Sequence, residues 1–307
     1  MNQHTAKLRP IGVACAGWHR FKVGDFEVTA VSDGQLPLQP SSGFEGAPAA
    51  EIDSLLAEHF LPNKRLMLGQ NCLVVNTGAR LVLIDTGMGD SMGEASHMFG
   101  PSTGHMVGNL RAAGFDPADI DVVVLTHAHA DHSWGLVDAE GCAVFPNAEL
   151  ALSEEELRYW TDESNMALSP FNDLNVRGAI RNLTPYLDRL IMVRDGAEVI
   201  PGIVGVASPG HSIGHHAYLI TSGAESVFDI GDLAHHHVLA LRRPDWEISY
   251  DTDPKLAVRS RRRILDMLAT DRTPVLGYHF PWPGLGHIAR VADGYTWVAT
   301  PLDTFML

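Results

Sequence analysis

The chain has 307 residues, of which 45% are hydrophobic and 19% are charged, which is enough apolar material for a sizeable core and too little charge for a disordered chain. Asp and Glu outnumber Lys and Arg by 37 to 22, and the formal charge of −15 argues against nucleic acid as a main partner. No apolar run approaches the roughly 18 residues of a membrane span. Three widely spaced cysteines form no disulfide framework, whereas 16 clustered histidines direct attention to metal chemistry.

The N-terminal half of the chain predicts short strands and helices. Strands are expected at 26–32, 71–76, 80–85 and 121–126, and helices at 51–60 and 103–113. Loops are expected at 35–50 and 87–104, and the second of these is long enough to be a functional loop. The apolar stretch 11–17 is short for a secretory signal, so a cytoplasmic protein is expected, with cleavage after Ala16 or Gly17 and periplasmic export left open.

The C-terminal half repeats this alternation. Strands are expected at 143–145, 149–152, 204–207, 217–221, 226–230 and 274–277, the last being the final strand, and helices at 154–160, 176–187 and 254–269. Residues 162–173 are expected as an irregular insertion, and Asp253 is expected to cap the helix that starts with Pro254. No linker divides the chain, so we predict one layered α/β domain over 1–307 with an N-terminal extension at about 1–25.

Residues 127–132 read His127-Ala-His129-Ala-Asp131-His132 and form the most specific motif of the chain. Chance would produce this pattern about 0.005 times per chain of this composition. In an extended segment residues two apart point the same way, so His127 and His129 can converge on one ion. A tight turn then brings Asp131 and His132 towards a second ion. Imidazole and carboxylate together suit zinc, and also manganese, iron or cobalt.

Other metal-binding residue types follow predicted strands. His211 lies in Ser-Pro-Gly-His, Asp232 in Asp-Ile-Gly-Asp, and His279 in Gly-Tyr-His-Phe-Pro. Strand ends gather at one rim of the sheet in α/β proteins, so these side chains can meet the motif. Asp85 ends another strand, where it either forms a turn or accepts a hydrogen bond from a histidine ligand and so orients that ligand.

These segments, in this order, resemble the metallo-β-lactamase superfamily. The resemblance is carried by the motif at 127–132, Leu83-Ile-Asp85-Thr-Gly87, Pro209-Gly210-His211, Gly231-Asp232 and His279. More narrowly, the chain is similar to the methyl parathion hydrolase subgroup in Gly24-Asp25-Phe26-Glu27-Val28, Ser32-Asp33-Gly34, Asp251-Thr-Asp253-Pro254, His279-Phe-Pro and Gly284-Leu-Gly-His287. The resemblance implies a four-layer αβ/βα sandwich and a homodimer.

The resemblance also implies a complete set of ligands for two divalent ions, of which zinc is favoured and manganese, cobalt or iron(II) are alternatives. The first ion would be held by His127, His129 and His211, the second by Asp131, His132 and His279, and Asp232 would bridge both. Because seven ligands are already supplied, we expect His215 and His216 to orient ligands or to pack in the core.

The remaining candidate residues surround this motif. Three consecutive side chains, His235 to His237, cannot all face one point, so one of them can line the pocket while the others pack or are solvated. Pocket residues are predicted from apolar side chains near the motifs, with ordinary core packing as the alternative for each. They are Met92, Phe99, Trp134, Phe171 and Trp282.

The favoured function is a binuclear metal-dependent hydrolase of a neutral, rather hydrophobic small molecule. A metal-bridging hydroxide would attack a lactone, an aryl or alkyl ester or an organophosphate triester, and Asp131 and Asp232 would be the catalytic carboxylates, with Asp131 positioning the hydroxide or passing on its proton. No Lys or Arg stands beside the motifs to hold an anionic substrate. The alternative is an iron-dependent oxidoreductase of the persulfide dioxygenase type. Nucleic acid and membrane partners are not expected.

Overall fold

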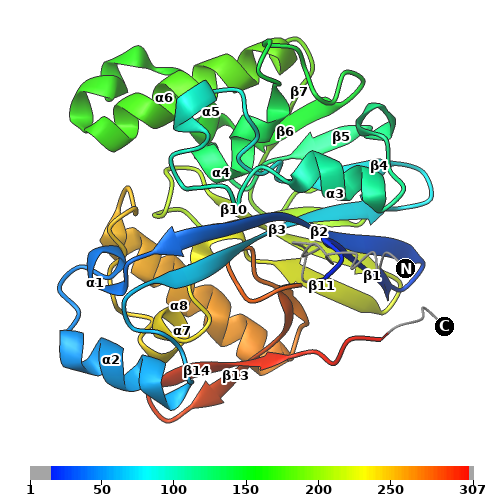
Figure 1. Cartoon of the computed structure of the whole chain (residues 1–307). Helices are drawn as coiled ribbons and strands as arrows, with labels where there is room; N and C mark the ends of the chain where they lie inside the picture. The colour runs from blue at the N-terminus through cyan, green and yellow to red at the C-terminus, as the bar shows by residue number, and fades with distance from the viewer. Residues whose placement is uncertain (1–14, 304–307) are drawn as a thin grey trace, which may run out of the picture.

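Two seven-stranded sheets face each other, and helices cover their outer sides (Figure 1). The computed structural model describes residues 15–303. Strands of the first sheet follow the chain order and are β1 (Trp18–Val23), β2 (Phe26–Leu38), β3 (Leu66–Asn76), β4 (Leu81–Ile84), β5 (Val122–Val124), β6 (Glu149–Ser153) and β7 (Leu190–Val193). The pairs from β1 to β4 are antiparallel, and those from β4 to β7 are parallel.

The second sheet has the order β14 to β8. Its strands are β8 (Glu198–Ile200), β9 (Ile203–Ala207), β10 (His216–Ser222), β11 (Glu225–Asp229), β12 (Val275–Leu276), β13 (Leu285–Val291) and β14 (Gly294–Ala299). Among the described strands of this second sheet, only β11 and β12 pair in parallel. The α-helices are α1 (Pro40–Gly43), α2 (Ala49–Glu58), α3 (Met106–Ala112), α4 (Ala130–Ser133), α5 (Glu154–Thr161), α6 (Pro170–Leu183), α7 (Leu239–Arg242) and α8 (Pro254–Asp271).

Three apolar cores separate four layers. Between the sheets, side chains such as Val28 and Leu73 meet Ile203 and Tyr218 of the opposite sheet. Helices α3, α5 and α6 bury their apolar faces on the outer side of the first sheet. Helices α2, α7 and α8 do the same on the second sheet. The predicted αβ/βα sandwich is therefore confirmed.

Strand β2 is longer than the sequence predicts. It runs from Phe26 to Leu38, so residues 35–38 belong to the strand and not to the expected loop 35–50. The register shifts between Ser32 and Gly34, which marks a β-bulge, and Gly34 has a φ of 121°. The bulge takes up the extra residue, and pairing with β3 then continues to Leu38.

The expected irregular insertion 162–173 is wrong. Glu163–Leu168 forms a 3₁₀ helix, and α6 already begins at Pro170, where the Ser169 hydroxyl accepts the Asn172 N–H at 3.1 Å. Helix α6 ends at Leu183, not at 187, and Thr184–Tyr186 is a separate 3₁₀ turn because Pro185 has no N–H to continue the helix. By contrast, Asp253 caps α8 as predicted, accepting the Leu256 N–H at 2.9 Å.

The sequence pattern did not predict the strands at the edges of the two sheets. Strand β1 lies in the expected N-terminal extension and pairs with β2, while residues 1–14 lie outside the described part of the chain. Strands β13 and β14 follow the segment 274–277 that was expected to be the final strand, and β7 and β8 are also unanticipated. The expected strand 143–145 is a loop with one bridge between Val137 and Ala143. Across residues 15–303, no helix combines the length and the apolarity that crossing a bilayer requires.

Candidate metal centre

The motif at 127–132 begins where β5 ends. Each of the three valines of β5 is fully buried, as expected for a parallel strand covered on both faces, and this rigid strand delivers His127 to the rim of the first sheet. His129 precedes α4 with extended backbone, φ −70° and ψ 164°, and the chain turns there into the helix that carries Asp131 and His132. The tight turn predicted within the motif is therefore present.

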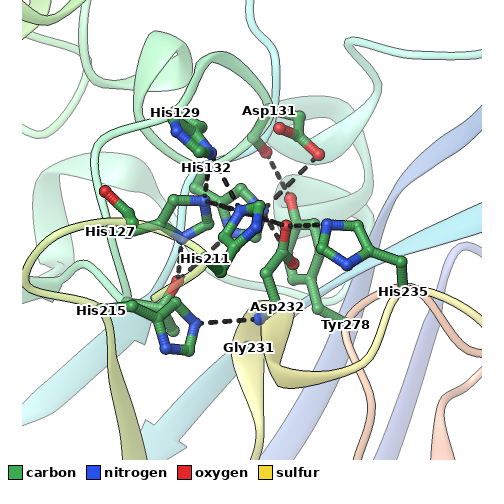
Figure 2. Close-up of polar contacts among 12 residues, drawn as sticks. His127, His129, Asp131, His132, His211, His215, Gly231, Asp232, His235 and Tyr278 are labelled. Atoms are coloured by element: carbon green, nitrogen blue, oxygen red, sulfur yellow. Dashed lines mark hydrogen bonds and ion pairs between the residues drawn. The ribbon is translucent and has the colours of Figure 1, made fainter. Parts of the chain in front are cut away.

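Three imidazoles, here called the first triad, converge on one point: His127, His129 and His211 (Figure 2). Nδ1 of His129 lies 2.9 Å from Nε2 of His127 and 3.0 Å from Nε2 of His211. The two Nε2 atoms are 3.2 Å apart. Ligand atoms bound tetrahedrally to zinc lie about 3.4 Å from one another, so these nitrogens have almost the spacing of a site for one ion.

A second group of three, the second triad, lies beside the first: Asp131, His132 and His279. Oδ2 of Asp131 is 3.5 Å from Nε2 of His132 and also 3.5 Å from Nε2 of His279. His279 follows β12, so the second sheet contributes to this triad just as it contributes His211 to the first.

The carboxylate of Asp232 stands between the triads, with one oxygen towards each (Figure 2). Its Oδ1 is 3.2 Å from Nε2 of His132 and 3.2 Å from Nε2 of His279. Its Oδ2 is 3.2 Å from Nε2 of His211 and 3.8 Å from Nε2 of His127. All seven residues that the resemblance implied as ligands are thus gathered in one buried cluster.

The chemistry of this cluster fits metal ions. His132 Nε2 and Asp232 Oδ1 are buried without a hydrogen-bond partner among the described residues, although an unsatisfied buried polar group costs about 1–3 kcal/mol. Imidazole nitrogens and carboxylate oxygens are ligands that zinc accepts. Metal binding would satisfy both orphaned atoms, and the cluster supplies ligands for two divalent ions.

Asp85 makes the contacts expected of a carboxylate that orients a ligand. Its Oδ2 accepts from Nδ1 of His132 at 2.7 Å, and the N–H and hydroxyl of Thr126 donate to its two oxygens, each at 2.8 Å. A proton held on Nδ1 leaves Nε2 of His132 free as a lone-pair donor. Asp85 has a φ of 59°, a left-handed conformation that Asp tolerates better than most residues.

Two further contacts hold the cluster from behind. The N–H of Asp232 donates to Nε2 of His215 at 3.0 Å, so the proton of that imidazole lies on Nδ1, which donates to Ser208 Oγ at 2.7 Å. His215 therefore orients the backbone of Asp232. Nδ1 of His211 lies 2.9 Å from Oδ1 of Asp251. Asp251 lies in the segment Asp251-Thr-Asp253-Pro254, and the resemblance carried by that segment is its one signal in the sequence.

The three consecutive histidines have different surroundings. Nε2 of His235 is 3.2 Å from Oδ2 of Asp232, and its ring stacks on that of His279 with centroids 5.2 Å apart. Nδ1 of His236 instead accepts backbone N–H groups at the start of α7. His237 packs on Phe280. As the geometry of consecutive side chains required, one of the three faces the cluster.

One predicted pocket residue lies against the cluster. Phe171 is 38% exposed, and its ring centroid is 5.1 Å from that of His129. Tyr250, which the sequence reasoning missed, is also 38% exposed and lies 6.3 Å from Phe171 and 6.5 Å from His235, centroid to centroid. These two half-exposed rings form an aromatic rim over the cluster.

The other predicted pocket residues are placed differently. Trp134 is fully buried in a small core with Met88, so it packs beneath the loop and does not line a pocket. Met92 and Phe99 are half-buried and pack on the same small core. Trp282 packs at the margin of the core between the sheets.

Burial and neighbouring charges shift the pKa values of the cluster residues in different directions. Burial lowers the pKa of His127 and of His129 well below the ordinary value, and neighbouring imidazoles add to this effect, so both rings are neutral and keep a lone pair for a metal. Burial also disfavours charged His132, but the carboxylates, Asp232 first, outweigh it and raise its pKa well above the ordinary value, so an ion that binds Nε2 of His132 must displace a proton. Burial opposes ionisation of Asp232, yet the imidazoles, His279 first, hold its pKa well below its usual range.

Comparisons with known proteins agree with this geometry. Residues 66–279 match the family described as the metallo-beta-lactamase superfamily. The dizinc quorum-quenching lactonase AidC, solved with a product, is 30% identical, with a TM-score of 0.85 over 94% of this chain and 99% of that one. The hydrolase AbOPH is 29% identical, with a TM-score of 0.87 over 95% and 100%. The N-acyl homoserine lactonase AiiA of Bacillus thuringiensis subsp. kurstaki is 24% identical over 71% of this chain and 84% of its own length.

Proposed function

We propose that this chain, which belongs to the metallo-beta-lactamase superfamily and is a metal-dependent hydrolase, opens lactone rings at a site built on the two triads. In this proposal His127, His129 and His211 hold the first ion. Asp131, His132 and His279 hold the second ion, and Asp232 spans both.

The position of Asp232 is the observation that carries the proposal. Its Oδ1 faces the second triad, 3.2 Å from Nε2 of His132, whereas its Oδ2 lies between the triads, 3.2 Å from Nε2 of His211 and 3.3 Å from Nε2 of His279. If Asp232 bound one ion or formed only an ion pair, its buried Oδ1 would be left without a hydrogen-bond partner beside the second triad, which is unfavourable. A site for two ions uses both oxygens.

The residues of the chain have separable roles in hydrolysis. Two bound ions would supply Lewis acidity, polarising the carbonyl oxygen and lowering the pKa of water. Asp131 has the most exposed side chain of the seven residues, at 14%, so its carboxylate is placed to take up and pass on a proton. Asp85 and His215 hold His132 and Asp232 in place, and their contacts keep the geometry preorganised.

The surroundings of the cluster favour a neutral substrate with an apolar part. Phe171 and Tyr250 present half-exposed rings next to it. Arg261 is linked to the cluster through Asp251, but its guanidinium donates to three backbone carbonyls and pairs with that carboxylate, so it is not free to bind an anion. The lactonase relatives favour a lactone over the aryl esters and organophosphates that remain in the test. The oxidoreductase alternative has no support among them.

The test combines metal content with three substrates. Purified protein is measured by ICP-MS and assayed with N-hexanoyl homoserine lactone, an aryl ester and a phosphotriester. We expect two ions per chain and the highest kcat/KM for the lactone. EDTA should abolish the activity, and Zn²⁺, Mn²⁺ or Co²⁺ should restore it. Activity that resists chelation, or an ester preferred over every lactone tested, would contradict the proposal.

A further inference from the structure

Glu156 is a fully buried carboxylate that the chemistry described so far does not use. It lies in the first turn of α5, whose two preceding residues, Glu154 and Glu155, are exposed. Burial raises its pKa above the ordinary value, which shows that the charge is costly where it stands. No Lys or Arg of the described chain pairs with it; hydrogen-bond donors surround it instead.

The donors to Glu156 come from two segments that are far apart in sequence. Its Oε2 accepts the N–H of Ala128 at 3.0 Å. Its Oε1 accepts the N–H of Gly214 at 2.7 Å and the hydroxyl of Ser212. One carboxylate therefore joins the loop after β5, in the first sheet, to the loop between β9 and β10, in the second sheet.

These two segments carry the whole first triad. Ala128 stands between His127 and His129, and Ser212 follows His211. The ligand nitrogens of the triad lie within 3.2 Å of one another, and this spacing requires the two loops to stay as close as the contacts of Glu156 hold them. Neighbouring contacts reinforce the junction, since Trp160 Nε1 donates to the Ser212 hydroxyl at 2.8 Å.

The second triad has no comparable contact with Glu156 in the described residues. His132 is held by Asp85, and Nδ1 of His279 faces the carbonyl oxygen of Gly69 at 2.8 Å. Removing the carboxylate of Glu156 should therefore loosen one triad and leave the spacing of the other intact.

We propose that Glu156 is a positioning residue that fixes the distance between the two loops of the first triad and so sets the affinity of the first ion selectively. This inference rests on the proposed two-ion site, but its test needs no substrate. It concerns the spacing of the protein's own metal-binding side chains, and a metal titration measures the resulting affinity directly.

The variant Glu156→Gln keeps the volume of the side chain. Its amide nitrogen is a donor, so whichever way the amide turns, one of the N–H groups of Ala128 and Gly214 faces another donor. The matched control is Glu155→Gln, because Glu155 is exposed on the same helix, one residue away. Circular dichroism and Tm establish that each variant is folded before metal is added.

Single-site backgrounds show which ion responds. His279→Ala disables the second triad, and His129→Ala disables the first. Zn²⁺ affinity is measured by competition with a chromophoric chelator, and Co²⁺ absorption reports the ligand geometry. In the His279→Ala background, Glu156→Gln should weaken the remaining ion about 10–100-fold and change the Co²⁺ spectrum, as loss of a residue that orients ligands typically does.

Glu155→Gln should change neither quantity, and in the His129→Ala background Glu156→Gln should leave the remaining ion unaffected. Equal weakening in both backgrounds, or no weakening in a folded variant, would overturn the inference. If Glu156→Gln does not fold, Ser212→Ala removes one of the three donors and should weaken the first ion in the same selective way. Failure to bind two ions in the unmodified chain would reject the proposed function, whereas absence of lactonase activity alone would leave the inference intact.

Discussion

The two triads are built from similar side chains but are held in place by different means. In the first, Asp251 contacts the ligand His211, and Glu156 in addition accepts from the backbone of both ligand loops, at Ala128 and Gly214. In the second, Asp85 touches the ligand His132 itself. Both triads take ligands from loops of the two sheets, and the difference lies in the group that joins the loops. In the first triad it is the buried carboxylate of Glu156, whereas in the second the Tyr278 hydroxyl donates to the carbonyl oxygen of Asp131.

Asp232 contacts residues of both triads, so its loss should weaken metal binding at both. We expect Asp232→Ala to stay folded, to lose metal from both triads and to lose more than about 100-fold in kcat/KM, beyond the range for orienting residues. Asp232→Asn keeps one oxygen that can bind a metal, so its kcat/KM should lie between those of the unmodified protein and Asp232→Ala. ICP-MS and steady-state kinetics measure the effect. Full turnover by a folded Asp232→Ala would show that one ion is sufficient.

Asp85→Asn should do to the second triad what Glu156→Gln does to the first. Asn also tolerates the left-handed backbone at this position, but its amide cannot accept from both His132 and Thr126 through two oxygens. We expect affinity for the second ion to fall about 10–100-fold. The measurement is the chelator competition in the His129→Ala background. No loss of affinity in that background would contradict the assignment of Asp85 to the second triad.

The aromatic rim should act on substrate and not on metal. Phe171 contacts His129, so Phe171→Ala should leave two ions bound while raising KM about tenfold for lactones with long acyl chains, because an apolar contact is lost. Lactones with short chains should change less. Leu168→Ala is the control, since Leu168 is 64% exposed on the preceding 3₁₀ helix. A loss of metal in Phe171→Ala would show that the ring supports the first triad instead.

The loop 88–104, beside the second triad, should affect the stability of the protein more than its activity. Buried Asp33 accepts N–H groups from both ends of this loop, Met88 at 2.9 Å and Gly104 at 3.1 Å, and Met88 packs near Ala130 of α4. Burial outweighs these donors and raises the pKa of Asp33 from 3.8 to about 6. A raised pKa adds stability below pH 4 that is lost as the pH rises through 6.

Asp33→Asn does not titrate, so the comparison isolates this effect. Between pH 4 and 6 the free energy of unfolding of the unmodified chain should fall relative to the variant by at most about 3 kcal/mol. Denaturant unfolding of the metal-free proteins at several pH values measures it, because metal affinity itself changes over this pH range. Parallel curves for the two proteins would mean that Asp33 keeps an ordinary pKa.

Local pattern predicted much of this protein. Buried valines identified β5, Asp253 and Pro254 identified the start of α8, and the motif at 127–132 with the later His and Asp residues identified a cluster that the structure gathers in one place. These features depend on neighbours in sequence or on residue types that metals require, and both can be read from a linear chain.

Contacts between distant segments could not be read in this way. Glu154, Glu155 and Glu156 are identical in sequence, and only the packing of α5 against both ligand loops buries the third. Trp134 resembled a pocket residue but is covered by the loop above it. Which carboxylate is buried, and which aromatic ring stays open to solvent, depends on surfaces that meet only after folding, so the tertiary structure alone decided them.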